Sequence, residues 1–183
     1  QLAWVAGLTR AIAGDHHGAA ELFHLVAQIG AAVGSRSTTL LVGPDLARSA
    51  TAAGDPARVD DALTSTRWAE SSSHVTQRAL ADWTRGLAEG DASIVADAAR
   101  ALTDRRPFDS ARALHDAAQL LAATHAAAAR ELATESLAIY ERLGASTFAL
   151  LLREDASRSG LRLRAGRPTG AKVGWDAVTA TER

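Results

Sequence analysis

The hydrophobic positions of this chain recur every three or four residues, which is the period of an amphipathic α-helix. Leu2, Trp4, Val5 and Leu8 set this spacing at once. Ala, Leu, Arg and Glu dominate the periodic segments and all favour helix, whereas no run alternates in the way a half-buried strand does. The pattern predicts an all-α fold with helices over 2–13, 16–33, 45–53, 56–70, 74–89, 92–105, 110–124, 126–143 and 146–159.

A short motif that combines small residues, Gly and Asp punctuates the helical segments. It occurs as AIAGD at 11–15, TAAGD at 51–55 and LAEGD at 87–91, and LAATH at 121–125 continues the series with His in place of Asp. In each motif Gly is expected to end one helix in the left-handed conformation, and Asp to cap the next helix. The motifs are 40, 36 and 34 residues apart, so the unit is a helical hairpin of about 36 residues.

The prolines are expected where a missing backbone N–H costs least. Pro44 and Pro56 are assigned to first helical turns, and Pro107 to a connection.

The third hairpin resembles a tetratricopeptide repeat. Trp83, Gly90, Ala99, Leu102 and Pro107 fall near the aromatic, Gly, small, apolar and Pro positions of that motif. Hairpins of this length bury their apolar faces by stacking on one another. We therefore expect residues 1–160 to form a tetratricopeptide-like right-handed solenoid, with residues 161–183 as a separate connecting segment.

Composition narrows the classes of function. A formal net charge of −1 argues against a general nucleic-acid binder. The chain lacks cysteine, which excludes disulfides and Cys-ligated zinc and fits a cytoplasmic location. Its apolar runs are too short and too interrupted to predict a membrane span.

The motif search predicts no catalytic residue and no cofactor. H-E-x-x-H, G-x-S-x-G and the phosphate-binding loop are all missing, and Lys172 is the only lysine. His17, Glu21 and His24 are spaced along one helical face as metal ligands could be. Because a di-iron bundle needs a second Glu-x-x-His, we interpret these three residues as a polar face and predict no metal site.

Two tryptophans next to arginines form the candidate binding groove. Arg67 and Trp68, with Trp83 and Arg85, could line the concave face of a helical solenoid, where a peptide or a small ligand would bind. The alternative interpretation is that these aromatic residues belong to the core.

The C-terminal segment is basic, with five positive and no acidic residues from Arg158 to Lys172. It is either a solvated linker or an arm that lies near DNA phosphates. As linker residues toward a further domain we single out Arg162, Arg164, Arg167, Lys172 and Trp175.

The sequence RPTGAKVGWDAVTATER at 167–183 resembles the junction before the helix-turn-helix of LuxR-type transcription regulators. Gly174, Trp175, Thr179 and Glu182 match the G-W-x-x-L-T-x-x-E pattern of that family, while Val178 replaces Leu. Thr179 and Glu182 also form a capping box, which marks a helix start. Upstream, ESLAIYERLGA at 135–145 is similar to the last repeat before this junction in the large ATP-binding members of the family.

The resemblance implies a bacterial cytoplasmic regulator with an N-terminal ATPase, a helical-repeat region and a C-terminal DNA-binding domain. On this interpretation the chain is a non-enzymatic segment that relays the binding of a protein or small-molecule inducer to a helix-turn-helix beyond Arg183. DNA would be contacted only through that domain, and homo-oligomer formation stays open. The alternative is a free-standing tetratricopeptide-like adaptor that binds a protein partner.

Overall fold

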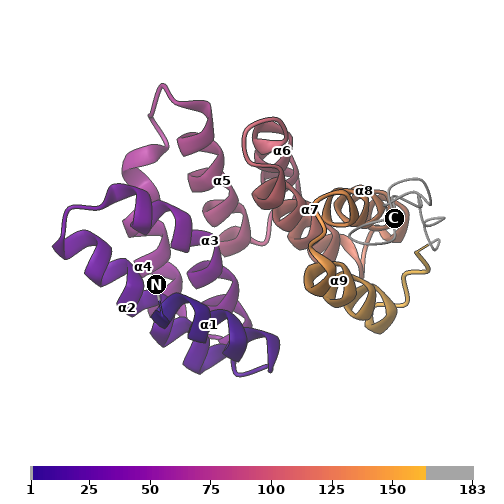
Figure 1. The fold of residues 1–183 in the computed structure, drawn as a ribbon, viewed down its shortest axis with the longest axis horizontal. Helices are drawn as coiled ribbons and strands as arrows, with labels where there is room; N and C mark the ends of the chain where they lie inside the picture. The colour runs from indigo at the N-terminus through magenta and orange to yellow at the C-terminus, as the bar shows by residue number, and fades with distance from the viewer. Residues whose placement is uncertain (1, 164–183) are drawn as a thin grey trace, which may run out of the picture.

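The computed structural model describes residues 2–163, which form nine α-helices and one 3₁₀ turn (Figure 1). The predicted all-α class is confirmed for these residues. Of the linker residues, Arg162 is exposed after the last helix, whereas Arg164, Arg167, Lys172 and Trp175 lie outside the described residues. The elements are α1 Leu2–Ile12, α2 His16–Ala32, α3 Arg36–Ala53, α4 Pro56–Thr66, η1 Arg67–Ala69, α5 Val75–Glu89, α6 Ala92–Leu102, α7 Pro107–Leu121, α8 Ala126–Arg142 and α9 Ser146–Arg158.

The Gly-Asp motifs end and start helices as predicted. Gly54 ends α3 at φ 67° and Gly90 ends α5 at φ 69°, both in the left-handed region that favours glycine. The next residue accepts hydrogen bonds from the first turn of the following helix: Asp55 from Arg58 N, and Asp91 from Ser93 N and Ile94 N. His125 occupies the same position before α8 but makes no side-chain cap.

The helix predicted over 45–53 begins too late, because α3 starts at Arg36. Pro44, predicted in a first helical turn, lies inside this helix. A proline inside a helix costs about 3 kcal/mol or more. Here every residue from Thr39 to Ala50 is buried except Leu41 and Arg48, which lie partly buried. The helix is thus enclosed by its neighbours, and this packing outweighs the local cost of Pro44.

Two other predicted boundaries also shift. The helix expected over 56–70 ends at Thr66 and continues as the 3₁₀ turn η1. Pro107 is not in a connection but begins α7 at its first position, where the missing N–H has no partner to lose.

Consecutive helices pack on one another along the chain, and α3 also packs on α5. In Figure 1, α1 to α4 lie on one side, α5 and α6 follow, and α7 to α9 lie on the other side. Trp83, Tyr140 and Phe23 are the largest fully buried side chains, and most of the remaining core is alanine, which allows close approach of the helices. Among residues 2–163, no helix is both long and apolar enough to cross a membrane.

Candidate functional site

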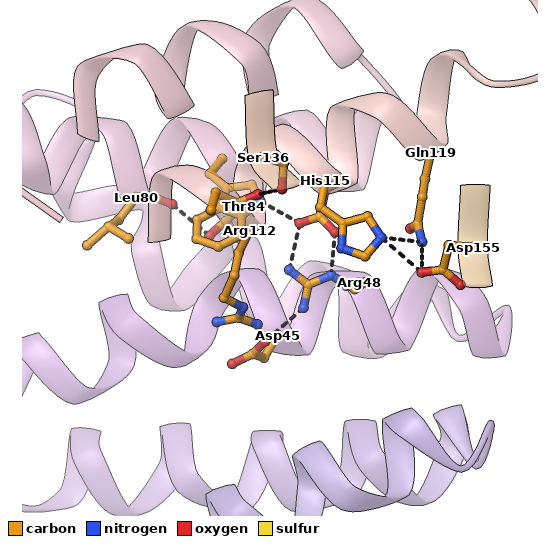
Figure 2. A network of polar contacts seen from close by, with 12 residues as sticks. Asp45, Arg48, Leu80, Thr84, Arg112, His115, Gln119, Ser136 and Asp155 are labelled. Carbon is orange, nitrogen blue, oxygen red and sulfur yellow. Dashed lines mark hydrogen bonds and ion pairs between the residues drawn. The ribbon is translucent and has the colours of Figure 1, made fainter. Parts of the chain in front are cut away.

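Two ion pairs join α3 to α7. Arg48 donates to Asp116 through Nε–Oδ1 at 2.7 Å and Nη2–Oδ2 at 2.6 Å, in the bidentate arrangement that suits a guanidinium and a carboxylate. In the opposite direction, Arg112 Nη2 donates to Asp45 Oδ1. Arg48 Nη1 also reaches Asp45 at 2.8 Å, so the four charges form one cluster (Figure 2).

A tryptophan completes the hydrogen bonding of each carboxylate. Trp4 of α1 donates from Nε1 to Asp45 Oδ2 at 2.9 Å, and Trp83 of α5 donates to Asp116 Oδ2 at 2.8 Å. The guanidinium carbons of Arg48 and Arg112 lie 5.7 and 5.4 Å from the centre of the Trp83 ring, within cation–π range. The cluster therefore ties α1, α3, α5 and α7 together.

The carboxylates and guanidinium groups of this cluster stabilise one another in their charged forms. Burial alone would raise the pKa of the Asp45 carboxyl, which is fully buried, but the nearby charges of Arg112 and Arg48 hold that pKa below its usual value. Burial disfavours the charged form of Arg48, yet the carboxylates of Asp116 and Asp45 raise the pKa of its guanidinium. Asp45 and Arg48 are therefore both charged at neutral pH.

A second polar group joins α7 to α9. His115 Nε2 lies 2.9 Å from Asp155 Oδ2, and Gln119 Nε2 donates to the same oxygen at 2.6 Å (Figure 2). Arg158, one turn further along α9, donates to Asp155 Oδ1. Partial burial would raise the pKa of Asp155, but the hydrogen bond with His115 and the positive groups around it lower that pKa on balance.

Both polar groups border a cavity of about 360 Å³. Helices α1 and α3 contribute one wall, and α7 and α9 the opposite wall. This volume lies in the range of small-molecule sites. The lining residues are Leu8, Ala11, Ile12, Gly14, His16, Arg48, Ser49, Ala52, Arg112, His115, Asp116, Gln119, Tyr140, Phe148, Leu151, Asp155 and Arg158.

Tyr140 of α8 lines this cavity and is fully buried. Its Oη has no hydrogen-bond partner among the described residues. Ser136, one turn earlier, donates to Ala111 O at 2.7 Å. Burial raises the pKa of Tyr140 well above its usual value, so the phenol is a neutral donor without an acceptor, which is costly in a protein interior.

The cavity offers fixed charges and hydrogen-bond donors. His115 and Asp155 are paired as a base and its orienting carboxylate can be, and Ser49 lines the same cavity. Within residues 2–163, however, no serine or threonine hydroxyl is hydrogen-bonded to His115. The arrangement is suited to holding a polar ligand.

The four residues predicted to line a groove do not gather at this cavity. Trp83 is 1% exposed and lies in the core beneath the ion-pair cluster. Arg67 and Trp68 belong to η1, where Arg36 stacks on Trp68 at 5.3 Å. Arg85 pairs with Asp82 at 2.8 Å on its own helix. None of the four is among the lining residues of the cavity.

The polar face with metal-like spacing makes ion pairs with α4. Glu21 accepts from Arg58 Nε at 2.8 Å, and His24 Nδ1 lies 3.2 Å from Asp61 Oδ2. Within the described part of the chain, no group of three ligand-type side chains converges as a metal site would require.

Sequence reasoning missed Asp45, Arg48, Arg112 and Asp116. A signal for them existed, because each pair lies among apolar residues: Asp-x-x-Arg in LVGPDLARSA and Arg-x-x-x-Asp in SARALHDAAQ. Charges in an apolar helical face are expected to have partners when they are buried. The pairing of one helix with the other could not be read from either segment.

No protein-family model, curated protein or solved structure matches this chain.

Proposed function

We propose that this chain is a non-enzymatic, ligand-responsive segment that relays binding to a DNA-binding domain in a LuxR-type regulator of the bacterial cytoplasm. The observation that carries the proposal is the cavity whose walls come from helices far apart in the chain, α1 and α3 on one side and α7 and α9 on the other. A ligand held there contacts both sides of the array at once.

The order in which the helices pack would let a bound ligand move distant parts of the chain. Each helix packs mainly on its neighbours in the chain, and we propose that the hairpins stack as a tetratricopeptide-like right-handed solenoid. In such a stack small changes of angle between neighbours add along the array. A ligand that alters the spacing between α3 and α7 would thereby displace α9, which leads toward residues 161–183.

The second support is the resemblance of residues 167–183 to the junction before a LuxR-type helix-turn-helix, with Gly174, Trp175, Thr179 and Glu182 at matching positions. ATP binding by an N-terminal domain and DNA binding by a C-terminal one would both belong to the parent protein.

The test is DNA selection with the full-length product of the natural gene. Genomic fragments retained by that protein are sequenced and compared with those retained by the 183-residue chain. A shared sequence motif enriched by the full-length protein but not by this chain supports the proposal. Absence of any enriched motif contradicts it, and co-purification of a stoichiometric protein partner in that case favours the adaptor alternative.

A further inference from the structure

The cavity of about 360 Å³ between α1, α3, α7 and α9 has a chemical character that identifies a class of ligand. This inference rests on the proposed function, since it names the ligand of the same relay. Three observations carry it: the acidic groups of the lining already have hydrogen-bond partners, hydrogen-bond donors remain, and the part of the lining that α1 supplies is apolar.

The acidic residues of the lining are Asp116 and Asp155. Asp116 accepts from Arg48 at both oxygens and from Trp83. Asp155 accepts from Arg158 at Oδ1, and His115 and Gln119 lie at Oδ2. Both oxygens of each carboxylate therefore have partners, so neither residue is an open acceptor for a cationic ligand.

Donors remain on the same lining. Arg112, whose side chain is 11% exposed, makes one hydrogen bond among the described residues, from Nη2 to Asp45. Tyr140 Oη, fully buried, makes none. Arg48 and Arg158 also line the cavity, each paired with a carboxylate. A ligand that supplies acceptor oxygens, and negative charge in particular, would satisfy this surplus through charge-assisted hydrogen bonds.

The lining also has an apolar part, most of it on α1. Leu8, Ala11 and Ile12 of α1 line the cavity, as does Leu151 of α9. Ile12 is 51% exposed, so an apolar ligand would remove this surface from water.

We infer that the cavity binds a small organic acid, with its carboxylate at Arg112 and Tyr140 and its apolar body against α1. An acid bound in this way contacts both walls of the cavity. Its binding would therefore change the spacing between α3 and α7.

The test uses a matched pair of probes, 3-phenylpropionate and the neutral 3-phenylpropionamide, titrated into the 183-residue chain and followed by the shifts of its amide NMR signals. We expect the acid to bind saturably and the amide to bind about tenfold more weakly, since the amide lacks the charge-assisted contact. Signals of α1, α7 and α9 should move together.

Two variants preserve the fold and test the contacts. Tyr140→Phe removes a hydroxyl that has no partner, and Arg158→Gln removes an exposed positive charge at the cavity. Each is expected to weaken binding of the acid by about fivefold, the effect of one hydrogen bond or nearby charge. The matched control is Arg153→Gln, because Arg153 is also an exposed, ion-paired arginine of α9 but does not line the cavity.

The inference is overturned if the acid does not saturate at millimolar concentration, if acid and amide bind equally, or if the acid binds both variants as it binds the unchanged chain. These outcomes are independent of the DNA selection. Acid binding without an enriched DNA motif would leave the site intact and refute the relay, whereas an enriched motif without acid binding would leave the relay intact and refute the ligand class.

Discussion

Arg48 on α3 holds Asp116 on α7 through two parallel hydrogen bonds of 2.7 and 2.6 Å, although the residues are 68 positions apart in the sequence. Trp83 of α5 donates to the same carboxylate and lies beneath the Arg48 guanidinium. This contact joins α3 directly to α7 across α5. A second ion pair joins the same two helices with the charges exchanged: Asp45 lies on α3 and Arg112 on α7.

The first prediction concerns the strength of this contact. Arg48→Met should lower the free energy of unfolding by about 3–5 kcal/mol, because it leaves the buried Asp116 charge without its main partner. Asp116→Asn should cost a comparable amount. The double variant should cost clearly less than the sum, since each single change already removes the shared contact. Urea unfolding of the four proteins measures this coupling.

The exposed pair Arg100 and Asp97 is the control for that cycle. Its atoms are as close, at 2.5 Å, but the side chains are 65% and 76% exposed. Screening by water should limit its coupling to about 0.5 kcal/mol. A coupling at Arg48 and Asp116 that is no larger than this would contradict the assignment of the buried cluster as the link between α3 and α7.

The second prediction concerns the close approach of α3 to its neighbours at Gly43. A Cβ added at Gly43 would lie 2.5 Å from Thr66 Cγ2 and 2.8 Å from Thr84 Oγ1. Gly43→Ala should therefore destabilise the fold by about 1–3 kcal/mol through overpacking. Thr66→Ser, which removes the contacted methyl group, should restore part of the loss when combined with Gly43→Ala. Melting temperatures of the single and double variants test this prediction. A Gly43→Ala variant that melts at the same temperature as the unchanged protein would refute it.

Local chemistry made the helix boundaries at Gly54, Asp55, Gly90 and Asp91 predictable. A left-handed glycine and a carboxylate that accepts from the next turn act over a few residues. Pro44 was misplaced by the same local reasoning. Its position inside α3 follows from enclosure by other helices, and that information is tertiary.

The candidate site could not be predicted from local sequence either, because it too depends on tertiary contacts. The ion pairs of Asp45 with Arg112 and of Arg48 with Asp116 join residues 67 and 68 positions apart. Helical spacing specifies which face a residue occupies but not which distant helix covers it. Trp83 was assigned both to a groove and, as the alternative, to the core. Its 1% exposure places it in the core.

The third prediction is a pH dependence at Asp155. Its pKa in the folded protein is held below the ordinary value of 3.8, because the contacts with His115, Arg158 and Gln119 outweigh the effect of partial burial. The stability that Asp155 contributes is therefore fully present above that ordinary value and is lost as the pH falls toward the lower, folded-state pKa. Asp155→Asn should lower stability at neutral pH and make it fall less steeply from pH 5 to pH 3, in roughly this window. Urea midpoints across this range measure the effect, and identical pH profiles for the two proteins would contradict it.

The fourth prediction compares two hydroxyl groups that lie one turn apart on α8. Ser136 Oγ donates to Ala111 O at 2.7 Å, whereas Tyr140 Oη has no partner within the described residues, and both side chains are fully buried.

Ser136→Ala should lower the free energy of unfolding by about 1–2 kcal/mol, because it leaves the buried Ala111 carbonyl without this donor. Tyr140→Phe should leave that free energy unchanged or raise it by about 1 kcal/mol, since an unpaired hydroxyl loses its hydration on folding and gains nothing in return. Urea unfolding at neutral pH, with equal m-values as the check on the unfolded state, separates the two. A loss from Tyr140→Phe as large as that from Ser136→Ala would mean that the phenol already has an acceptor, and it would remove the donor on which binding of an organic acid depends.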